Sequence, residues 1–310
     1  MASLFDPEEQ AGPGLVAPPS APVQESARQA GQVQNWRAAG LYVAGGSRSS
    51  SGKVCQDRIR IDTRGDVLAC TLADGAGSRC KSDTGAQVAV TEVCAELVEH
   101  FEELLLASPE ELAARLIGRV TDALAAEAQR LDCALREFAS TLAFVAVCDR
   151  RFIAGNLGDG VVARVGSSSE EILIPPERGE FANQTYFATD PGAAGHLRIK
   201  SGTLDQYHGF ILMTDGPAKL LYDYRTRRLA PNGIQIGGWL LGHEADPVLD
   251  GLDEILARDI VPRAGDDCTI GLVTCIDPDH AVKEPVASEP TPAPRRKKAR
   301  RARRGKRKAT

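Results

Sequence analysis

Hydrophobic positions repeat with a helical period in the first half of the chain. Within residues 85–106 they recur at spacings of three and four, which predicts an amphipathic helix. Residues 108–111, Ser-Pro-Glu-Glu, then combine a capping serine, a proline suited to the first turn and a glutamate that can close a capping box. We therefore expect a second helix from this point to about Leu135.

Shorter apolar runs, bounded by turn residues, predict strands on both sides of this helix pair. The expected strands are residues 57–61, 67–73, 141–148, 152–156, 161–165, 171–174, 197–200, 210–214 and 269–274. Two more helices are expected at 217–224 and at 247–259, the second capped by Asp246. Many strands with hairpin-length links and a central helix pair predict an α+β fold, in which helices cover stacked antiparallel sheets.

Composition divides the chain into four parts. Residues 1–36 are rich in Ala, Pro, Gly, Gln and Ser without a regular period, which predicts a disordered N-terminal arm. Residues 37–277 carry the periodic pattern and form the expected domain. Residues 278–294 have the Pro/Ala-rich composition of a linker, and residues 295–310 form a basic tail, which we expect to be disordered.

Charge is distributed very unevenly between these parts. The net charge is −5, but residues 295–308 contain 11 Lys and Arg residues and no acidic residue. Without those 11 positive charges, residues 1–294 carry −16. The tail can neutralise phosphates of nucleic acid or an anionic membrane, fold back on the acidic body, or stay solvated. No base-reading module is visible, so sequence-specific DNA binding is not expected.

The chain contains no stretch of about 18 consecutive apolar residues, so we expect no transmembrane helix. It also has no basic segment followed by an apolar one at its N-terminus, so we expect no secretory signal and a cytoplasmic location. The eight cysteines are scattered without a C-x-x-C pair, and several lie in apolar runs. We therefore expect reduced thiols rather than disulfides or a zinc site.

Acidic residues gather at the ends of the predicted strands. The positions are Asp57, Asp74, Asp159, Asp215 and the Asp266-Asp267 pair, and glycine directly follows three of them. A single Asp-Gly is typical of a turn. Several carboxylates beside a core are costly, however, unless they are paired or bind metal. Carboxylate oxygens suit Mg²⁺, Ca²⁺ or Mn²⁺, and the carbonyl after Asp74 can add a ligand.

These acidic positions belong to an ordered series of motifs between residues 40 and 276. The series is Gly45-Gly46-Ser47, Gly52-Lys53-Val54-Cys55-Gln56-Asp57, Ala73-Asp74-Gly75-Ala76-Gly77-Ser78, Ser82-Asp83-Thr84-Gly85-Ala86, Ala139-Ser140-Thr141-Leu142-Ala143, Gly155-Asn156-Leu157-Gly158-Asp159-Gly160, Met213-Thr214-Asp215-Gly216 and Gly265-Asp266-Asp267-Cys268-Thr269. In this order and spacing the chain resembles the type 2C metal-dependent protein phosphatases, in particular the compact bacterial branch.

The resemblance implies a four-layer α-β-β-α sandwich, two antiparallel sheets flanked by helix pairs, with two metal ions at one end. It implies Mn²⁺ or Mg²⁺, hydrolysis of phosphoserine and phosphothreonine by a metal-activated water, a phosphoprotein substrate, and a Ser/Thr kinase acting on the same targets. The implied metal ligands are Asp57, Asp74 with the Gly75 carbonyl, Asp215, Asp266 and, for a third ion, Asp159. The implied catalytic residues are Asp57, Asp74, Asp215 and Asp266.

Among the departures from the family pattern, which include Gln56 where a carboxylate is common and Gly160 in place of the usual Ser, two concern the acid and the phosphate-binding group. Many eukaryotic members have histidine after the Asp-Gly pair, where this chain has Ala76. The family's phosphate-binding arginine has no direct match, and the candidates for that role are Arg48 and Lys53. This second departure motivates an alternative function, a catalytically weak phosphatase-like binding or regulatory domain with an anion-binding or nucleic-acid-binding tail.

Overall fold

The computed structural model describes residues 26–45, 54–166, 169–177 and 185–276, which form two stacked antiparallel sheets covered by helices. The first sheet has the order β1 (Ser26–Val33), β2 (Trp36–Val43), β13 (Cys268–Cys275), β10 (Gly209–Met213), β7 (Val161–Val165) and β8 (Glu170–Ile174). The second has the order β3 (Arg58–Arg64), β4 (Val67–Ala73), β5 (Leu142–Cys148), β6 (Arg151–Leu157) and β9 (Arg198–Thr203).

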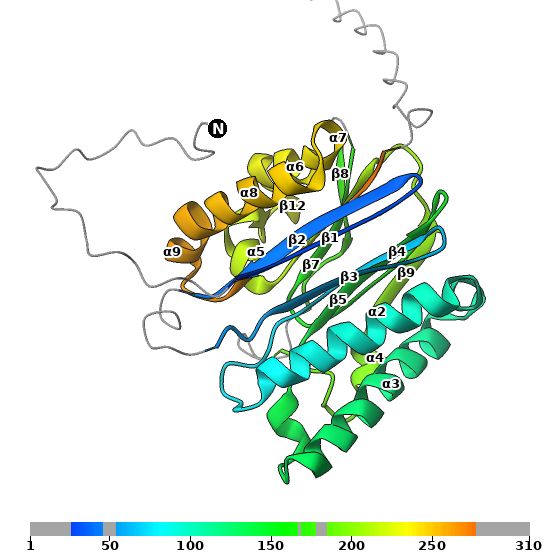
Figure 1. Cartoon of the computed structure of the whole chain (residues 1–310), viewed down its shortest axis with the longest axis vertical. Helices are drawn as coiled ribbons and strands as arrows, with labels where there is room; N and C mark the ends of the chain where they lie inside the picture. The colour runs from blue at the N-terminus through cyan, green and yellow to red at the C-terminus, as the bar shows by residue number, and fades with distance from the viewer. Residues whose placement is uncertain (1–25, 46–53, 167–168, 178–184, 277–310) are drawn as a thin grey trace, which may run out of the picture.

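The helices lie on the two outer faces (Figure 1). The five-stranded sheet carries α2 (Ser82–Leu106) and α3 (Pro109–Arg130), with the short α4 (Ala193–His196) and a 3₁₀ turn at Leu135–Phe138. The six-stranded sheet carries α5 (Asp215–Leu221), α6 (Pro231–Gly237), α7 (Trp239–Gly242), α8 (Ala245–Ile255) and α9 (Val261–Ala264), with a π-helical turn at Leu256–Ile260 and a small β11 (Tyr222–Asp223), β12 (Arg228–Leu229) pair. The expected four-layer α+β sandwich is confirmed.

Three hydrophobic layers hold the sandwich together. Phe101, Leu116 and Phe144 belong to the layer between the long helices and the five-stranded sheet. Residues of both sheets form the central layer, where Trp36 stacks on Phe210. The third layer packs α5–α9 on the outer face of the six-stranded sheet. Strands buried on both faces account for the near-continuous apolar runs in the sequence.

The start of α3 has the predicted capping box. The hydroxyl of Ser108 accepts a hydrogen bond from the Glu111 amide, and the Glu111 carboxylate accepts one from the Ser108 amide. The helix ends at Arg130, earlier than the predicted Leu135. Asp132 adopts a left-handed conformation with φ 49°, which ends the helix.

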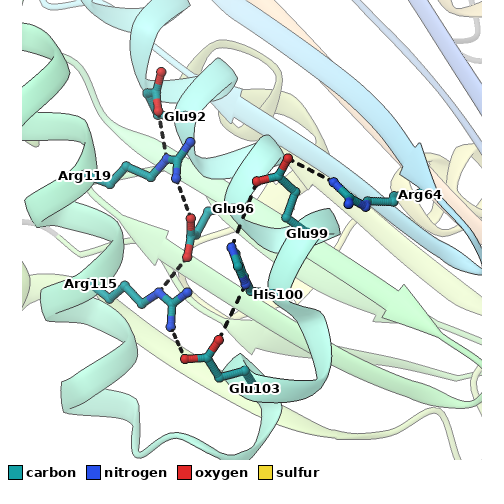
Figure 2. Close-up of polar contacts among 8 residues, drawn as sticks. All are labelled: Arg64, Glu92, Glu96, Glu99, His100, Glu103, Arg115 and Arg119. Carbon is teal, nitrogen blue, oxygen red and sulfur yellow. Dashed lines mark hydrogen bonds and ion pairs between the residues drawn. The ribbon is translucent and has the colours of Figure 1, made fainter.

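A charged network joins α2 and α3 across their contact (Figure 2). Glu96 is only 3% exposed and accepts hydrogen bonds from Arg115 at 2.6 Å and from Arg119 at 2.7 Å. Each arginine reaches a second carboxylate, Glu103 and Glu92 respectively. The pairing satisfies a carboxylate that would otherwise be too costly to bury.

Two further expectations about the ends of elements are wrong. The disordered arm was expected to reach residue 36, but β1 pairs along its whole length with β2. Backbone hydrogen bonds to a neighbouring strand hold this polar segment, and Arg28 adds ion pairs to α8. Asp246 was expected to cap α8, but the cap position is Glu244 and Asp246 lies in the first helical turn.

All eight cysteines are free thiols, six of them buried. No helix in the described part of the chain combines the length and the hydrophobicity that a membrane span requires.

Candidate metal and phosphate site

Strand register brings the predicted carboxylates to one end of the sandwich. In the five-stranded sheet Arg58 pairs with Ala73, so Asp57 and Asp74 extend from the same end of the β3–β4 hairpin. In the six-stranded sheet Met213 pairs with Ile270, and Asp215 and Asp266 lie just beyond this pair. Antiparallel pairing therefore places Asp57 beside Asp74 and Asp215 beside Asp266, and the stacking of the two sheets brings both pairs to the same end of the sandwich.

Two threonine hydroxyls connect the two sheets at Asp57. The Oδ2 atom of Asp57 accepts hydrogen bonds from Thr214 Oγ1 at 2.9 Å and from Thr269 Oγ1 at 2.7 Å. The Thr269 amide in turn donates to Thr214 Oγ1 at 3.0 Å. These contacts fix the orientation of a carboxylate that is only 1% exposed.

The carboxylates are close enough to oppose each other's ionisation. Burial and then the negative charge of Asp267 raise the pKa of Asp57 to about 7, although the two threonine hydroxyls act in the opposite direction. Burial also raises the pKa of Asp74 well above its usual value, and four other carboxylates add to this effect: Asp57, Asp215, Asp266 and Asp159. The end of the sandwich is thus a concentration of negative charge that a cation would stabilise.

The donor set suits a hard divalent cation. The Oδ1 atoms of Asp57 and Asp215 are buried and have no hydrogen-bond partner among the described residues, although such oxygens are costly to leave unpaired. Oxygen ligands of this kind are those that Mg²⁺ and Mn²⁺ prefer. Within the same residues, no three His, Cys, Asp or Glu side chains already form a cage for a single ion. The carboxylates therefore lie near one another, but their oxygens do not surround a single ion position.

Asp159 lies at the same end, in the turn between β6 and β7. Its Oδ2 atom accepts a hydrogen bond from Thr185 Oγ1 at 3.1 Å. Nearby, the side-chain amide of Asn156 donates to the carbonyls of Gly158 and Gly160, at 3.3 and 3.0 Å, and closes the turn. Gly158 has φ +104°, a conformation that favours glycine.

Gly75 is placed where only glycine fits. A Cβ atom there would lie 2.7 Å from the carbonyl oxygen of Ser82 and 2.9 Å from that of Gln56. The Gly75 amide donates to the Gln56 carbonyl at 3.1 Å. The backbone directly after Asp74 is thereby held tightly beside the segment that precedes Asp57.

Asp267 is a structural carboxylate in the midst of the predicted ligands. Its Oδ1 accepts a hydrogen bond from the Gly45 amide at 2.7 Å, and its Oδ2 accepts one from the Gln56 amide at 2.8 Å. The two amides lie on either side of residues 46–53. One buried side chain thus holds together both ends of the segment that carries Arg48 and Lys53.

Lys219 is a cation inside this acidic group. Its ammonium nitrogen lies 2.9 Å from Asp215 Oδ2 and 3.3 Å from Asp266 Oδ2. Burial lowers the pKa of Lys219, but its hydrogen bonds to the two carboxylates and their charges outweigh this effect, so the pKa is above its usual value. The ammonium group therefore stays charged.

The structure brings the five predicted carboxylates to one end of the sandwich, but the sequence analysis assigned no role to the groups that contact them. Arg48 and Lys53, the predicted phosphate-binding residues, lie outside the described residues. The contacts that were not predicted are those of Thr214, Thr269, Asp267 and Lys219, although the first three stand in the quoted motifs. The contact of Lys219 could have been predicted, because residues four positions apart on a helix, such as Asp215 and Lys219, can form an ion pair. The sequence gives no comparable indication for the threonines.

A family model described as Protein phosphatase 2C matches residues 44–256, more than half of the chain. The chain is also 30% identical over 192 residues to the serine/threonine-protein phosphatase 3 of Escherichia coli (strain K12), a match that covers 60% of this chain and 75% of that protein.

Solved structures share the fold at low sequence identity. A serine/threonine phosphatase of S. agalactiae superposes with a TM-score of 0.57 at 16% identity, covering 77% of this chain and 99% of that one. RsbX, solved in complex with magnesium, superposes with a TM-score of 0.51 at 14% identity, covering 80% of this chain and 100% of that one.

Proposed function

The chain belongs to the protein phosphatase 2C family and is a protein serine/threonine phosphatase, and we propose that Asp57, Asp74, Asp215 and Asp266 hold the two metal ions of its active site. The observation that carries the proposal is the convergence of carboxylates from both sheets, with buried oxygens that lack a partner among the described residues. The Gly75 carbonyl would add a ligand, and Asp159 would support a third ion.

The chemistry of the family divides between the ions and the protein. Bound Mn²⁺ or Mg²⁺ would acidify a water molecule and neutralise the phosphate. The protein orients the ligands: Thr214 and Thr269 hold one oxygen of Asp57, and the tight backbone at Gly75 positions its own carbonyl. Arg48 and Lys53 would bind the phosphate oxygens, Arg48 through a two-pronged guanidinium contact and Lys53 as a point charge.

Hydrolysis assays test this assignment. With Mn²⁺ present we expect turnover of p-nitrophenyl phosphate and of a phosphoserine or phosphothreonine peptide, and loss of turnover in EDTA. Asp74→Asn and Asp215→Asn should each lower kcat by more than the roughly 10–100-fold typical of an outer-sphere partner. Wild-type rates no higher than those of the variants would overturn the proposal and favour a phosphoprotein-binding domain without catalysis.

We also propose how the remaining parts of the chain contribute. Phosphoproteins modified by a Ser/Thr kinase in the cytoplasm are the expected substrates, since the enzyme must oppose such a kinase to have an effect. Residues 278–294 would act as a linker and residues 295–308 as an anion-binding tail, supported by the 11 basic residues there. Removing 295–310 should reduce salt-dependent binding to DNA, and unchanged binding would exclude this role.

A further inference from the structure

Lys219 occupies a position that the proposed metal site needs. It lies one turn after Asp215 on α5, and its ammonium nitrogen contacts one oxygen of Asp215 and one of Asp266. These two carboxylates come from the ends of neighbouring strands, β10 and β13. The ammonium group therefore sits between two of the four proposed metal ligands, at the position where an ion bound to both of them would lie.

We propose that Lys219 is a built-in competitor of the divalent cation: its ammonium group bridges Asp215 and Asp266 when the site is empty and must withdraw before an ion can bind both carboxylates. The inference rests on the proposed function, since it concerns the same site. Lys219 would thereby determine the free metal concentration that is needed to fill the site.

Electrostatics require the exchange. Metal ligands lie about 2.0–2.6 Å from Mg²⁺ or Ca²⁺, so an ion bound to both aspartates would be very close to an ammonium that contacts the same two oxygens. Two cations at such a distance repel strongly wherever the surroundings are less polar than water. The ion and the ammonium group cannot both hold this position.

The side chain of Lys219 can leave. It is 40% exposed, and its charge is carried on a flexible four-carbon stem that can turn towards solvent. Asp215 is 19% exposed and its Oδ1 atom has no hydrogen-bond partner among the described residues, so the carboxylate keeps an oxygen available for an ion. Release of the lysine therefore breaks two partly exposed ion pairs and requires no rearrangement of the core.

Calorimetric titration with Mn²⁺ and with Mg²⁺ at fixed pH and ionic strength tests the proposal. Lys219→Gln should bind the first ion at least tenfold more tightly than the wild type, equivalent to about 1.4 kcal/mol. Lys219→Arg, which keeps the positive charge, should remain near the wild-type affinity. Arg64→Gln removes an exposed positive charge at the closed end of the β3–β4 hairpin, opposite the end that carries Asp57 and Asp74, and should leave the affinity unchanged.

A second measurement uses the wild type alone, in case Lys219→Gln does not fold. Amine labelling followed by peptide mass spectrometry should show that Lys219 is protected in EDTA and more reactive with saturating Mn²⁺. Lys200, an exposed residue of β9, is the control, and its reactivity should be the same in both conditions. Protection that is the same in both conditions would overturn the proposal.

Three calorimetric outcomes separate the possibilities. Equal or weaker Mn²⁺ affinity in Lys219→Gln would overturn the inference while leaving the metal site intact. Unchanged Mn²⁺ affinity with weaker binding of inorganic phosphate would overturn it too, and would make Lys219 a phosphate ligand. Absence of Mn²⁺ binding in both the wild type and Asp74→Asn would refute the proposed function itself.

Discussion

Replacing Asp267 with alanine should destabilise the protein because one buried side chain holds two separate backbone segments. Both carboxylate oxygens accept hydrogen bonds from backbone amides, at 2.7 Å from Gly45 and 2.8 Å from Gln56, and the residue is 3% exposed. The substitution removes both bonds and leaves two amide groups without their acceptor.

The expected loss follows from these two bonds. Hydrogen bonds to a charged group each contribute roughly 1.5–3 kcal/mol, so together they account for about 3–6 kcal/mol. Part of this is offset, because the charge of Asp267 disfavours the ionised form of Asp57 and its removal relieves that repulsion. We therefore expect Asp267→Ala to lower the free energy of unfolding by about 2–4 kcal/mol.

Urea denaturation in EDTA, followed by the fluorescence of Trp36 and Trp239, measures the change without a contribution from metal. The neighbouring carboxylate provides the control: Asp266 is 43% exposed, so Asp266→Ala should cost less than about 1 kcal/mol. A loss below about 1 kcal/mol for Asp267→Ala, or equal losses for both variants, would refute the reasoning. The KM for p-nitrophenyl phosphate should also rise, because the segment with Arg48 and Lys53 loses its common attachment.

Three further predictions concern single side chains. Gly75→Ala should lower stability by roughly 1–3 kcal/mol in thermal denaturation, because its Cβ would clash with two carbonyls. Gly118→Ala, where α3 has open space for a Cβ, should be neutral or stabilising. Equal effects of the two substitutions would contradict the clash at Gly75. Glu96→Leu should cost roughly 2 kcal/mol in urea by leaving Arg115 and Arg119 without their shared buried partner, and a double-mutant cycle with Arg119→Leu should show a smaller combined loss than the sum. In EDTA, the stability of Asp57→Asn relative to the wild type should rise by up to about 4 kcal/mol as the pH increases from about 4 to 7. Over this range the unfolded wild type loses the Asp57 proton while the folded wild type retains it, so the wild type alone loses stability. A stability difference that stays constant across this range would contradict the raised pKa of Asp57.

The hydrophobic periods predicted the α+β class and the long elements, and the motif resemblance predicted the four-layer arrangement. Strands β4 and β7 have the predicted bounds, and the Ser108 capping box starts α3 where expected. Elements that depend on tertiary contacts could not be predicted. The polar β1 is ordered by pairing with β2, and the short α6 and α7 have too few residues for a period to show.

The same distinction holds for the site. Aspartates at strand ends followed by glycine are visible in the sequence, and the structure brings them together. Their orienting partners are not visible, since Thr214 and Thr269 become neighbours of Asp57 only when the two sheets stack. The role of Asp267 also depends on this stacking, because its two amide donors lie 211 and 222 positions away.

The central layer between the sheets is very thin at Gly40 and Gly271. A Cβ atom at Gly40 would lie 2.5 Å from the side chain of Ile59, and one at Gly271 would lie 2.7 Å from the sulfur of Cys70. Because Asp57 and Asp74 belong to one sheet and Asp215 and Asp266 to the other, the spacing of the proposed ligands is fixed by how closely these glycines let the sheets approach. A larger side chain at either glycine would therefore change the metal affinity, although both positions lie away from the ligands. Conversely, removing the metal with a chelator would make the two sheets easier to separate.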